Sequence, residues 1–352
     1  DGQIDYLYEY DKKDQVTQVM DQVTGQATTR RYNTFSQIAS ETLAHGLTLD
    51  YGYDHLDRIC RLDLPDHSAV QYIHGALNLK EARRLQAGKV SYTLAETKHN
   101  LCGQVEEVLL PGNNGSAFYQ YDTMGRCTKI SSNGHEQQVP AGGYDPVGNL
   151  THDLFNGEER FFEYDELNQL TSEKGRRYQF DSLFNRTQTD DLVCRYNALN
   201  QLLSQGEEQF SYDKNGNMVE RRFKDQVTRY SYDALDRLIS IQKGQTEVRY
   251  AYDAFNRRIS RRVGEKEQLF LYLSLEEVGL WEAGQLKEFK LLVKNQTSSI
   301  AAIEIDEKLF VPHHDLSGNI VALTNEKGEL VEKYCYSAFG ECQVTDSRGK
   351  SL

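Results

Sequence analysis

The most ligand-like group of side chains in this sequence is His313-His314-Asp315, because imidazole and carboxylate together can bind a divalent metal. Neighbouring residues of a strand point to opposite faces, however, so His313 and His314 cannot easily share one ion. The many Tyr-Asp pairs could supply paired carboxylates for acid/base hydrolysis of a glycosidic bond. A position at the start of a turn explains these aspartates at least as well, so we predict neither a metal site nor a catalytic site.

Other signatures of catalysis are missing from the sequence. It contains no phosphate-binding loop, no GxSxG or HExxH motif and no dinucleotide fingerprint, so we expect no enzyme activity and no cofactor. The six cysteines form no CxxC pair, and we expect buried reduced thiols, although Cys335 and Cys342 are close enough in sequence to pair across a hairpin. Glycosylation sequons matter only if the protein is secreted from a eukaryotic cell, and they lie at Asn114, Asn149, Asn185 and Asn295.

The composition favours an all-β protein. The 352 residues include 22 Tyr, 14 Phe and 26 Gly but only 5 Pro and 3 Met, a usage that suits strands and glycine turns. A net charge of −13 argues against nucleic acid or an anionic membrane surface as partner, because both attract basic patches. No apolar run approaches the roughly 20 residues that a membrane-spanning helix needs.

A repeated unit organises most of the chain. It consists of an aromatic residue, any residue, Tyr-Asp, two free positions, then Gly, Asn or Asp, a polar residue and an aliphatic residue. The motif residues of the clear copies are Tyr53, Asp54, Asp57, Tyr121, Asp122, Gly125, Tyr164, Asp165, Asn168, Tyr212, Asp213, Gly216, Tyr232, Asp233, Asp236, Tyr252, Asp253 and Asn256. Weaker copies open at Asp11, Asn33, Asn100, Asp145, Asp181 and Asn197. In the copy at Asp181, Phe184 stands where Gly is expected, and we predict a different turn there.

The residue types of the unit predict a β-hairpin. Aromatic-x-Tyr places two rings on one face of a strand, because side chains alternate with a period of two. Asp then opens the turn, where its carboxylate can accept a hydrogen bond from the backbone N–H group of the residue two positions later. The third residue after Asp is Gly, Asn or Asp, the types that tolerate positive φ, which indicates a type I turn with a G1 bulge. Successive hairpins without helical crossovers form an antiparallel meander.

The length of this meander predicts a coiled sheet. Each repeat adds about 10 Å of sheet width, so some 15 repeats make a ribbon on the order of 150 Å long. Open twisted sheets rarely exceed about 10 strands without curling, and one closed turn would have a diameter of about 45 to 50 Å, too wide for side chains to fill. We therefore expect a cavity. Between Leu56 and Ala95 no clear copy occurs, and Lys80–Ala87 could form a short helix.

The Tyr-Asp-x-x-Gly-Arg-Leu unit resembles the YD repeats of Rhs proteins, of the shell-forming subunits of bacterial toxin complexes and of teneurins. The segments Phe310–Val331 and Tyr334–Glu341 resemble the part of the family that precedes the Rhs core domain. The resemblance implies a YD-repeat array over residues 1–263, and over 264–352 a continuation of the same sheet leading to a core that this chain lacks. It also implies that the coiled sheet is part of a hollow shell.

In that family the shell holds a C-terminal toxin, so the resemblance implies a non-catalytic shell segment that encapsulates a toxin or effector cargo. The family continues beyond the point that matches Leu352 into a core with an aspartate self-cleavage site and then a variable effector, so no catalytic residue is carried over. The implied partners are that downstream domain and a secretion-system or carrier protein, and the implied location is secreted or cell-surface, in bacteria. An adhesion module that binds a surface glycan or protein is the alternative, and a polysaccharide hydrolase ranks last.

Overall fold

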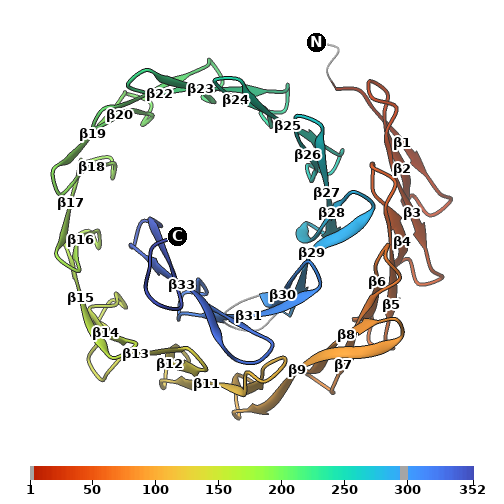
Figure 1. The fold of residues 1–352 in the computed structure, drawn as a ribbon, viewed down its shortest axis with the longest axis horizontal. Helices are drawn as coiled ribbons and strands as arrows, with labels where there is room; N and C mark the ends of the chain where they lie inside the picture. The colour runs from red at the N-terminus through yellow and green to blue at the C-terminus, as the bar shows by residue number, and fades with distance from the viewer. Residues whose placement is uncertain (1–3, 294–299) are drawn as a thin grey trace. The chain divides into compact units, whose positions relative to one another are not determined.

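The computed structural model describes residues 4–293 and 300–352, and every helix or strand in these residues is a β-strand (Figure 1). The first half of the chain contains β1 (Tyr6–Tyr10), β2 (Val16–Asp21), β3 (Ala27–Tyr32), β4 (Ile38–Thr42), β5 (Thr48–Tyr53), β6 (Ile59–Asp63), β7 (Ala69–His74), β8 (Leu79–Gln86), β9 (Lys89–His99), β10 (Val105–Leu109), β11 (Ser116–Tyr121), β12 (Cys127–Ser132), β13 (His135–Gln138), β14 (His152–Phe155), β15 (Glu158–Tyr164), β16 (Leu170–Glu173) and β17 (Arg176–Phe180). The second half contains β18 (Arg186–Thr189), β19 (Leu192–Tyr196), β20 (Leu202–Gln205), β21 (Glu208–Tyr212), β22 (Met218–Phe223), β23 (Gln226–Tyr232), β24 (Leu238–Lys243), β25 (Thr246–Tyr252), β26 (Arg258–Val263), β27 (Lys266–Leu273), β28 (Glu276–Glu282), β29 (Gln285–Leu292), β30 (Ile300–Ile305), β31 (Lys308–His314), β32 (Ile320–Asn325), β33 (Leu330–Tyr336) and β34 (Cys342–Asp346). The all-β prediction is confirmed.

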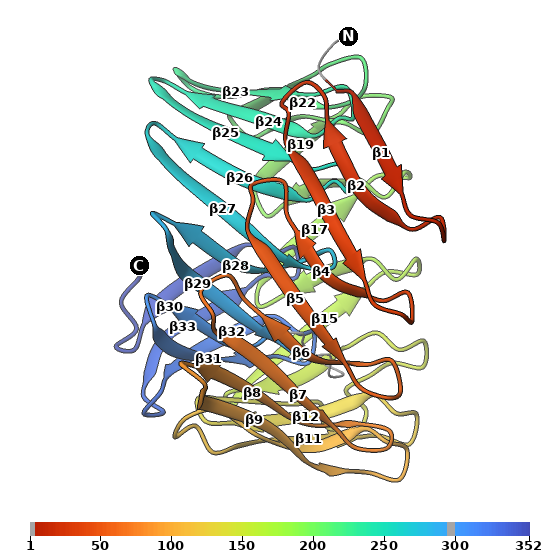
Figure 2. The ribbon, with the colours of Figure 1, turned by 90° about the vertical axis from the view of Figure 1, so that its right-hand side faces the viewer.

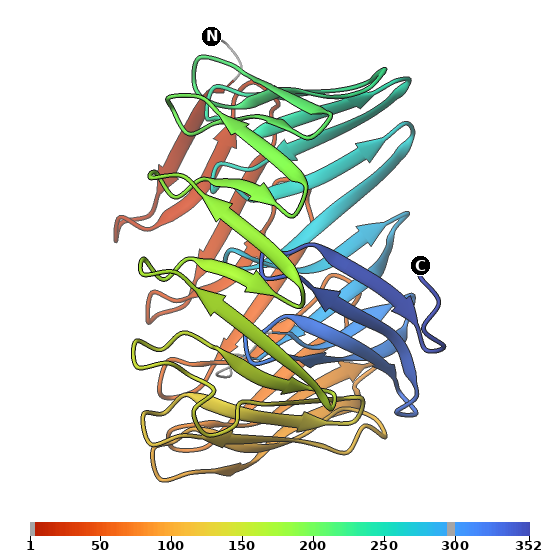
Figure 3. The same cartoon turned by 90° about the vertical axis from the view of Figure 1, so that its left-hand side faces the viewer.

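Strands adjacent in sequence pair antiparallel, as Figure 2 shows for β1–β4 and Figure 3 for the green strands. In hairpin β23–β24, Tyr230 is opposite Ile241 and Ser231 opposite Ser240, but Tyr232 is opposite Leu238, so one residue is skipped. The same shift occurs at the motif tyrosine of β11–β12 and of β25–β26. Each Tyr-Asp turn therefore carries the bulge that its residue types predict.

The chain divides into two compact units, each built from two segments that are distant in sequence. Unit 1 comprises Asp1–Asp50 and Arg176–Gln285, and unit 2 comprises Tyr51–Gly175 and Leu286–Leu352. The predicted boundary between residues 263 and 264 stays a prediction. β26 and β27 pair across that point, with Val263 opposite Lys266.

The buried side chains of each unit concentrate where its two segments meet. In unit 1 these include Leu43 and Leu49 from one segment and Phe270 and Leu271 from the other. Between Tyr178 and Ile259, by contrast, Cys194 is the single buried hydrophobic residue, within the described part of the chain. That stretch is a sheet of one layer, stabilised by contacts between neighbouring strands rather than by a thick core.

The same arrangement holds in unit 2. Val70 and Leu94 are buried on one segment, and Leu291 and Val311 are buried on the other. The hydroxyl of Tyr72 donates to the carbonyl of Leu292 at 3.1 Å, which joins the two segments directly.

The predicted helix over Lys80–Ala87 is wrong, because these residues form most of strand β8. β8 pairs along its whole length with β7 and β9. Ala82 and Arg84 are buried while the residues between and beside them are half-exposed, a period of two that pairing imposes on a segment of helix-forming residues.

Candidate functional site

The Tyr-Asp turns are the most regular polar feature of both units, and the turn at Asp233 shows their geometry. The Oδ1 atom of Asp233 accepts from the backbone N–H groups of Leu235 at 2.9 Å and Arg237 at 3.0 Å. The N–H of Asp233 donates to the carbonyl of Arg237, and that of Asp236 donates to the carbonyl of Asp233. One carboxylate and two carbonyls thus hold the whole turn.

The third residue after the opening Asp or Asn has positive φ at every predicted copy. The angles are +60° at Asp14, +62° at Asp57, +79° at Gly103, +80° at Gly125, +97° at Gly148, +60° at Asn168, +59° at Asn200, +95° at Gly216, +59° at Asp236 and +61° at Asn256. The prediction of a different turn at Phe184 is wrong. Phe184 has φ of +66° and the hydrogen bonds of the other turns, because the carboxylate of Asp181 and the strand register fix the backbone despite the ring.

In eight repeats a tyrosine hydroxyl links one turn to the preceding one. Tyr232 donates its hydroxyl hydrogen to the carbonyl of Met218 at 3.0 Å, and Tyr252 donates to that of Leu238 at 2.9 Å. In both cases the acceptor is the fifth residue after the opening Asp of the preceding repeat. The same bond is made by Tyr32, Tyr121, Tyr164, Tyr196, Tyr212 and Tyr272.

The polar residue at the fourth position after Asp makes a second link, toward the following turn. Arg237 Nη1 donates to the carbonyl of Asp253 at 3.0 Å, and Asn217 Nδ2 donates to Oδ1 of Asp236 at 2.7 Å. The turns therefore lie side by side along one edge of the sheet, which we call the turn edge of each unit. Our sequence reasoning explained neither the tyrosine hydroxyl nor this polar position.

Sequence reasoning also missed whole repeats. His74 replaces the motif tyrosine and contacts the carbonyl of Ile59 through Nε2 at 3.0 Å. A turn opened by Leu43 has Gly46 at φ of +91°, and a turn opened by Leu64 has His67 at φ of +64°. Gly46, three positions after the opening residue, is a signal that could have found the first of these turns, whereas His67 gives no such signal for the second.

The hydrogen bonds of the turns favour ionised motif aspartates. Desolvation raises the pKa of Asp54, but hydrogen bonds from the Arg58 side chain and from the backbone N–H groups of Arg58 and Leu56 outweigh it and bring the pKa to about 2. For Asp181 the largest effect is the hydrogen bond from the Asn185 side chain, which lowers the pKa. These carboxylates are accounted for by turn formation and are not poised for proton transfer near neutral pH.

In unit 1 a turn of one segment docks on strands of the other. The Arg257 guanidinium, at the turn opened by Asp253, contacts the carboxylate of Glu41 on β4 at 2.7 Å, and both side chains are buried. The Arg30 guanidinium of β3 lies 4.0 Å from the ring centre of Phe255. A turn that opens at Leu43 docks in return, since His45 Nε2 lies 2.9 Å from the carbonyl oxygen of Phe270.

In unit 2 the turns of β31–β34 dock on the other segment. The backbone N–H of Leu316 donates to Oε1 of Gln137, and that of Ala338 donates to Oε1 of Glu173, both at 2.8 Å. A buried ion pair strengthens the contact between the segments, with Arg84 Nε 2.7 Å from Glu304 Oε1. Through these contacts both units use the turn edge to join distant segments.

The structure gives His313 a packing role. Its Nδ1 lies 2.8 Å from Ser132 Oγ and its Nε2 lies 2.8 Å from Thr324 Oγ1, which ties the two segments of unit 2 together. Burial is the main cause that lowers the pKa values of His313 and His314 to about 4, and the nearby His135 contributes to the same shift. Within the described residues no cluster of three or more His, Cys, Asp or Glu side chains could hold a metal ion.

The cysteines are less buried than expected, although all six are free thiols. Cys194 is buried, but Cys102, Cys335 and Cys342 are exposed, so the prediction of burial is wrong for these three. Cys102 lies at a turn tip, where the side chain points to solvent. Cys342 is opposite Tyr336 while Cys335 is opposite Gln343, so the two thiols lie on opposite faces of β33–β34 and do not pair.

Three of the four sequon asparagines make side-chain hydrogen bonds within the fold. The Asn114 side chain is buried and donates to the carbonyls of Pro111 and Asn325. Asn149 and Asn185 donate to the motif carboxylates of Asp145 and Asp181. Asn295 lies outside the described residues.

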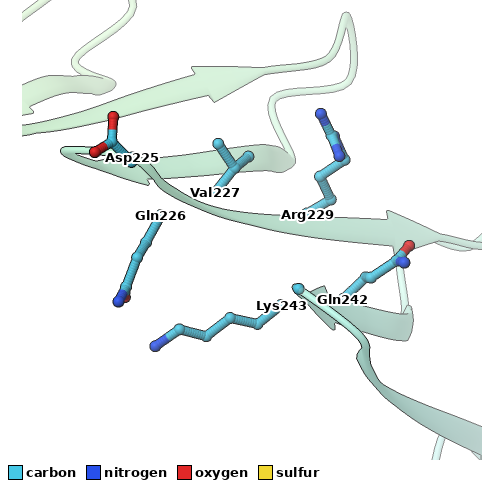
Figure 4. Close-up of a pocket in the computed structure, with 7 residues that line it drawn as sticks. Asp225, Gln226, Val227, Arg229, Gln242 and Lys243 are labelled. Atoms are coloured by element: carbon cyan, nitrogen blue, oxygen red, sulfur yellow. The ribbon is translucent and has the colours of Figure 1, made fainter.

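A shallow pocket of about 470 Å³ lies at the hairpin ends of β22–β23 and β24–β25. Figure 4 shows that Gln226 and Lys243 point away from Val227 and Arg229, so the lining side chains do not converge on one point. Arg229 lies 3.5 Å from Glu220, which offsets its charge. The pocket offers no arrangement of acid, base and nucleophile.

Comparisons with known proteins identify the architecture. The family model described as teneurin YD-shell matches residues 1–139 and 158–350. Comparison with curated protein sequences found no match. The solved structure titled "Crystal Structure of TcdB2-TccC3-Cdc42" is 13% identical, with a TM-score of 0.61 over 94% of this chain and 21% of that one. "Crystal Structure of TcdB2-TccC3-TEV" is 10% identical, with a TM-score of 0.40 over 99% of this chain and 28% of that one.

The likeness to the first of these structures concerns the fold alone, and this chain spans less than a third of the length of either. The family match is more specific, because it covers the repeats and the segment after them. Together with the Tyr-Asp turns and their tyrosine links, it shows that the chain belongs to the teneurin YD-shell family.

Proposed function

We propose that this chain is a wall segment of a hollow shell that encloses a toxin or effector domain of a longer polypeptide. The observation that supports the proposal best is the one-layered sheet between Tyr178 and Ile259, where side chains on both faces stay partly exposed. A sheet of this kind suits the wall of a shell, because it lacks the buried core that a second sheet would form with it in a β-sandwich. Its width of about 10 Å per repeat is consistent with coiling around a cavity.

The work of such a wall is steric and electrostatic, and we propose that the chain is not an enzyme. The motif aspartates serve the turns, His313 serves packing, and the described residues hold no metal cluster. No helix in the described residues is long and apolar enough to cross a membrane. We further propose a secreted or cell-surface location in bacteria and a secretion-system or carrier protein as a second partner.

A low-resolution density map of the purified chain tests the wall. We expect a curved sheet around an open space, whereas a solid sandwich or propeller would contradict the shell. Sequencing the gene downstream of the Leu352 codon tests the cargo. We expect an arginine- and tyrosine-rich core motif followed by an unrelated domain, and a stop codon there would leave the encapsulation proposal without cargo.

A binding experiment on this chain alone distinguishes the shell from the alternative, a module that binds a surface glycan or protein. Saturable binding on a glycan array, lost when the exposed Phe161 is replaced by alanine, would favour the alternative. Absence of binding together with a cavity in the density map would favour encapsulation.

A further inference from the structure

Three histidines meet where the two segments of unit 2 are joined. His135 is the first residue of β13, and His313 and His314 are the last two residues of β31. His135 is 3% exposed and His313 is 2% exposed, while His314 is half-buried. His135 repels a positive charge on either of the other two rings, and His314 repels one on His313, so the three imidazoles lie close together. We call these three residues the histidine cluster.

The hydrogen bonds of His313 are those of a neutral ring. Asn114 Nδ2 donates to two backbone carbonyls, so Oδ1 of the same amide is the acceptor for the hydroxyl of Thr324. Thr324 Oγ1 then accepts from Nε2–H of His313, which leaves Nδ1 of that ring to accept from the Ser132 hydroxyl. Ser132 lies on the other segment of unit 2, and a proton on Nδ1 would reverse its bond to the ring.

A charged His135 would lack an acceptor for one of its two N–H groups. Asn156 Oδ1 accepts from the backbone N–H of Glu136, so Nδ1 of His135 carries the hydrogen that is donated to the same oxygen at 3.1 Å. Nε2 is buried and has no hydrogen-bond partner among the described residues. A second proton would therefore form a buried N–H group without an acceptor, which is unfavourable.

Charged groups on three neighbouring elements act on His135. Asp315, in the turn after β31, and Glu136 of β13 favour its protonated form, whereas Arg160 of β15 disfavours it. Arg160 is itself paired with Asp153 of β14, and Asp315 accepts hydrogen bonds within its own turn. The other two histidines are affected by the charges of the cluster itself. Burial outweighs the attraction, and all three pKa values are lowered to about 4.

We infer that acidification separates β31–β34 from the other segment of unit 2 at the histidine cluster, while the hairpins of unit 1 stay folded. Once the segments separate, water solvates the three rings and each binds a proton with its ordinary affinity. Protonation below about pH 6.5 then favours the open form, and deprotonation restores the closed one. The ion pair between Arg84 and Glu304 of β30 contains no histidine, so β30 should stay attached. The inference does not rest on the proposed function.

Two backbone N–H groups report on this opening directly. Those of Asn113 and Leu316 each donate across the two segments, to a backbone carbonyl and to a carboxamide, neither of which titrates. Hydrogen exchange of the full chain at pH 7 and pH 5 gives their protection factors, from which the intrinsic effect of pH on exchange is removed. We expect both factors to fall about tenfold or more at pH 5, because each histidine that binds a proton raises the opening constant by about this much.

The N–H of Asp236, which closes a turn of unit 1, is the reference and should change less than about threefold, because unit 1 does not open. Unchanged protection of Asn113 and Leu316 at pH 5 overturns the inference. A reference that loses as much protection as the two reporters overturns it too, because acid then unfolds the whole chain.

Histidine variants show whether the cluster is the cause. His135→Gln and His314→Gln should each reduce the loss of protection at pH 5 about tenfold, because each variant has one proton fewer to bind in the open form. His55→Gln, at an exposed turn position of unit 2, is the matched control and should leave the loss unchanged. If one cluster variant does not fold, the other is compared with the original chain. The same loss in a folded cluster variant as in the original chain overturns the inference.

Discussion

At the scale of the residue, the oxygen that the motif Asp presents to the backbone matters more than its charge. Asp165 Oδ1 accepts from the N–H groups of Leu167 and Gln169 at 2.9 Å, and Asn197 Oδ1 makes the same bonds to Leu199 and Gln201. Asp165→Asn should therefore change the free energy of unfolding by less than about 0.5 kcal/mol, whereas Asp165→Ala should lower it by about 1 to 3 kcal/mol. Urea denaturation of the two variants checks this, and equal losses would contradict it.

The buried histidines predict a pH dependence. The pKa of His313 is about 4 in the folded chain against 6.5 unfolded, so between these values the unfolded state binds more protons. The free energy of unfolding should fall as the pH decreases from 6.5, by about 2 kcal/mol at pH 5 from this residue alone. The carboxylates of Asp54, Asp122, Asp145, Asp181 and Asp213, whose pKa values are lowered in the folded chain, add their loss of stability below about pH 4.

Replacement of His313 by glutamine separates this effect from general acid unfolding. The variant is expected to be less stable at pH 7, because Ser132 and Thr324 lose their ring partner, but its stability should decline less between pH 7 and pH 5. His55→Gln, at an exposed turn position, is the control and should keep the decline of the original chain. Urea denaturation of the original chain and both variants at pH 7, 6 and 5 gives the change in the free energy of unfolding with pH for each. If this change is the same in the His313→Gln variant as in the original chain, the assignment is refuted.

Residue types predicted the turn conformation well, because positive φ is a local property that Gly, Asn and Asp tolerate. They failed at Phe184, where the hydrogen bonds to Asp181 impose the left-handed conformation on a residue that does not favour it. They could not give the acceptor of the tyrosine hydroxyl. That acceptor depends on how the next hairpin is placed, which the motif itself does not encode.

At the scale of the element, the strands follow from alternation and the turn positions, so most hairpins could be predicted. β8 could not, because Leu79–Gln86 contains good helix formers and lacks a motif at its start. Its strand conformation comes from pairing with β7 and β9, which satisfies backbone groups that an isolated segment would satisfy as a helix. Pairing with neighbours outweighs local propensity there.

The link between consecutive turns predicts a difference between two tyrosines on the same face of β25. Tyr252→Phe removes the hydroxyl that donates to the Leu238 carbonyl and should lower the free energy of unfolding by about 1 kcal/mol. Tyr250→Phe is the control and should be close to neutral, because the Arg258 guanidinium over its ring remains. Thermal or urea unfolding compares them, and an equal loss in both would mean that the hydroxyl bond does not stabilise the edge.

At the scale of the whole molecule, each unit is formed by segments more than 100 residues apart, and this the sequence did not reveal. Arg84 and Glu304 carry no periodic signal and match no motif, yet they form a buried ion pair to which Tyr92 also donates. Contacts of this kind depend on the three-dimensional path of the sheet. A repeat motif constrains neighbouring hairpins and leaves the choice of distant partners open.

Removal of one member of this pair should be costly. Arg84→Met leaves Glu304 buried without its cation and should lower the free energy of unfolding by about 3 to 5 kcal/mol. The double variant Arg84→Met with Glu304→Leu should recover most of that loss, since no charge is left buried. A double-mutant cycle by urea denaturation, with the exposed pair Arg249 and Glu247 as control, measures the coupling, and additive losses would contradict it.

The tyrosine links of the turn edge have a consequence for how such a chain can change in length. The donor and acceptor of this bond are 10 residues apart for Tyr212, 14 for Tyr232 and 16 for Tyr121. The bond is the same in each case, so the additional residues are accommodated toward the other end of the hairpin. The border of the sheet that carries the Tyr-Asp turns therefore keeps a constant geometry, and the hairpins can differ in length at the opposite border. Insertions and deletions of single residues are expected to accumulate in loops such as 156–157, 174–175 and 224–225. At the turn edge the chain is expected to gain or lose whole repeats.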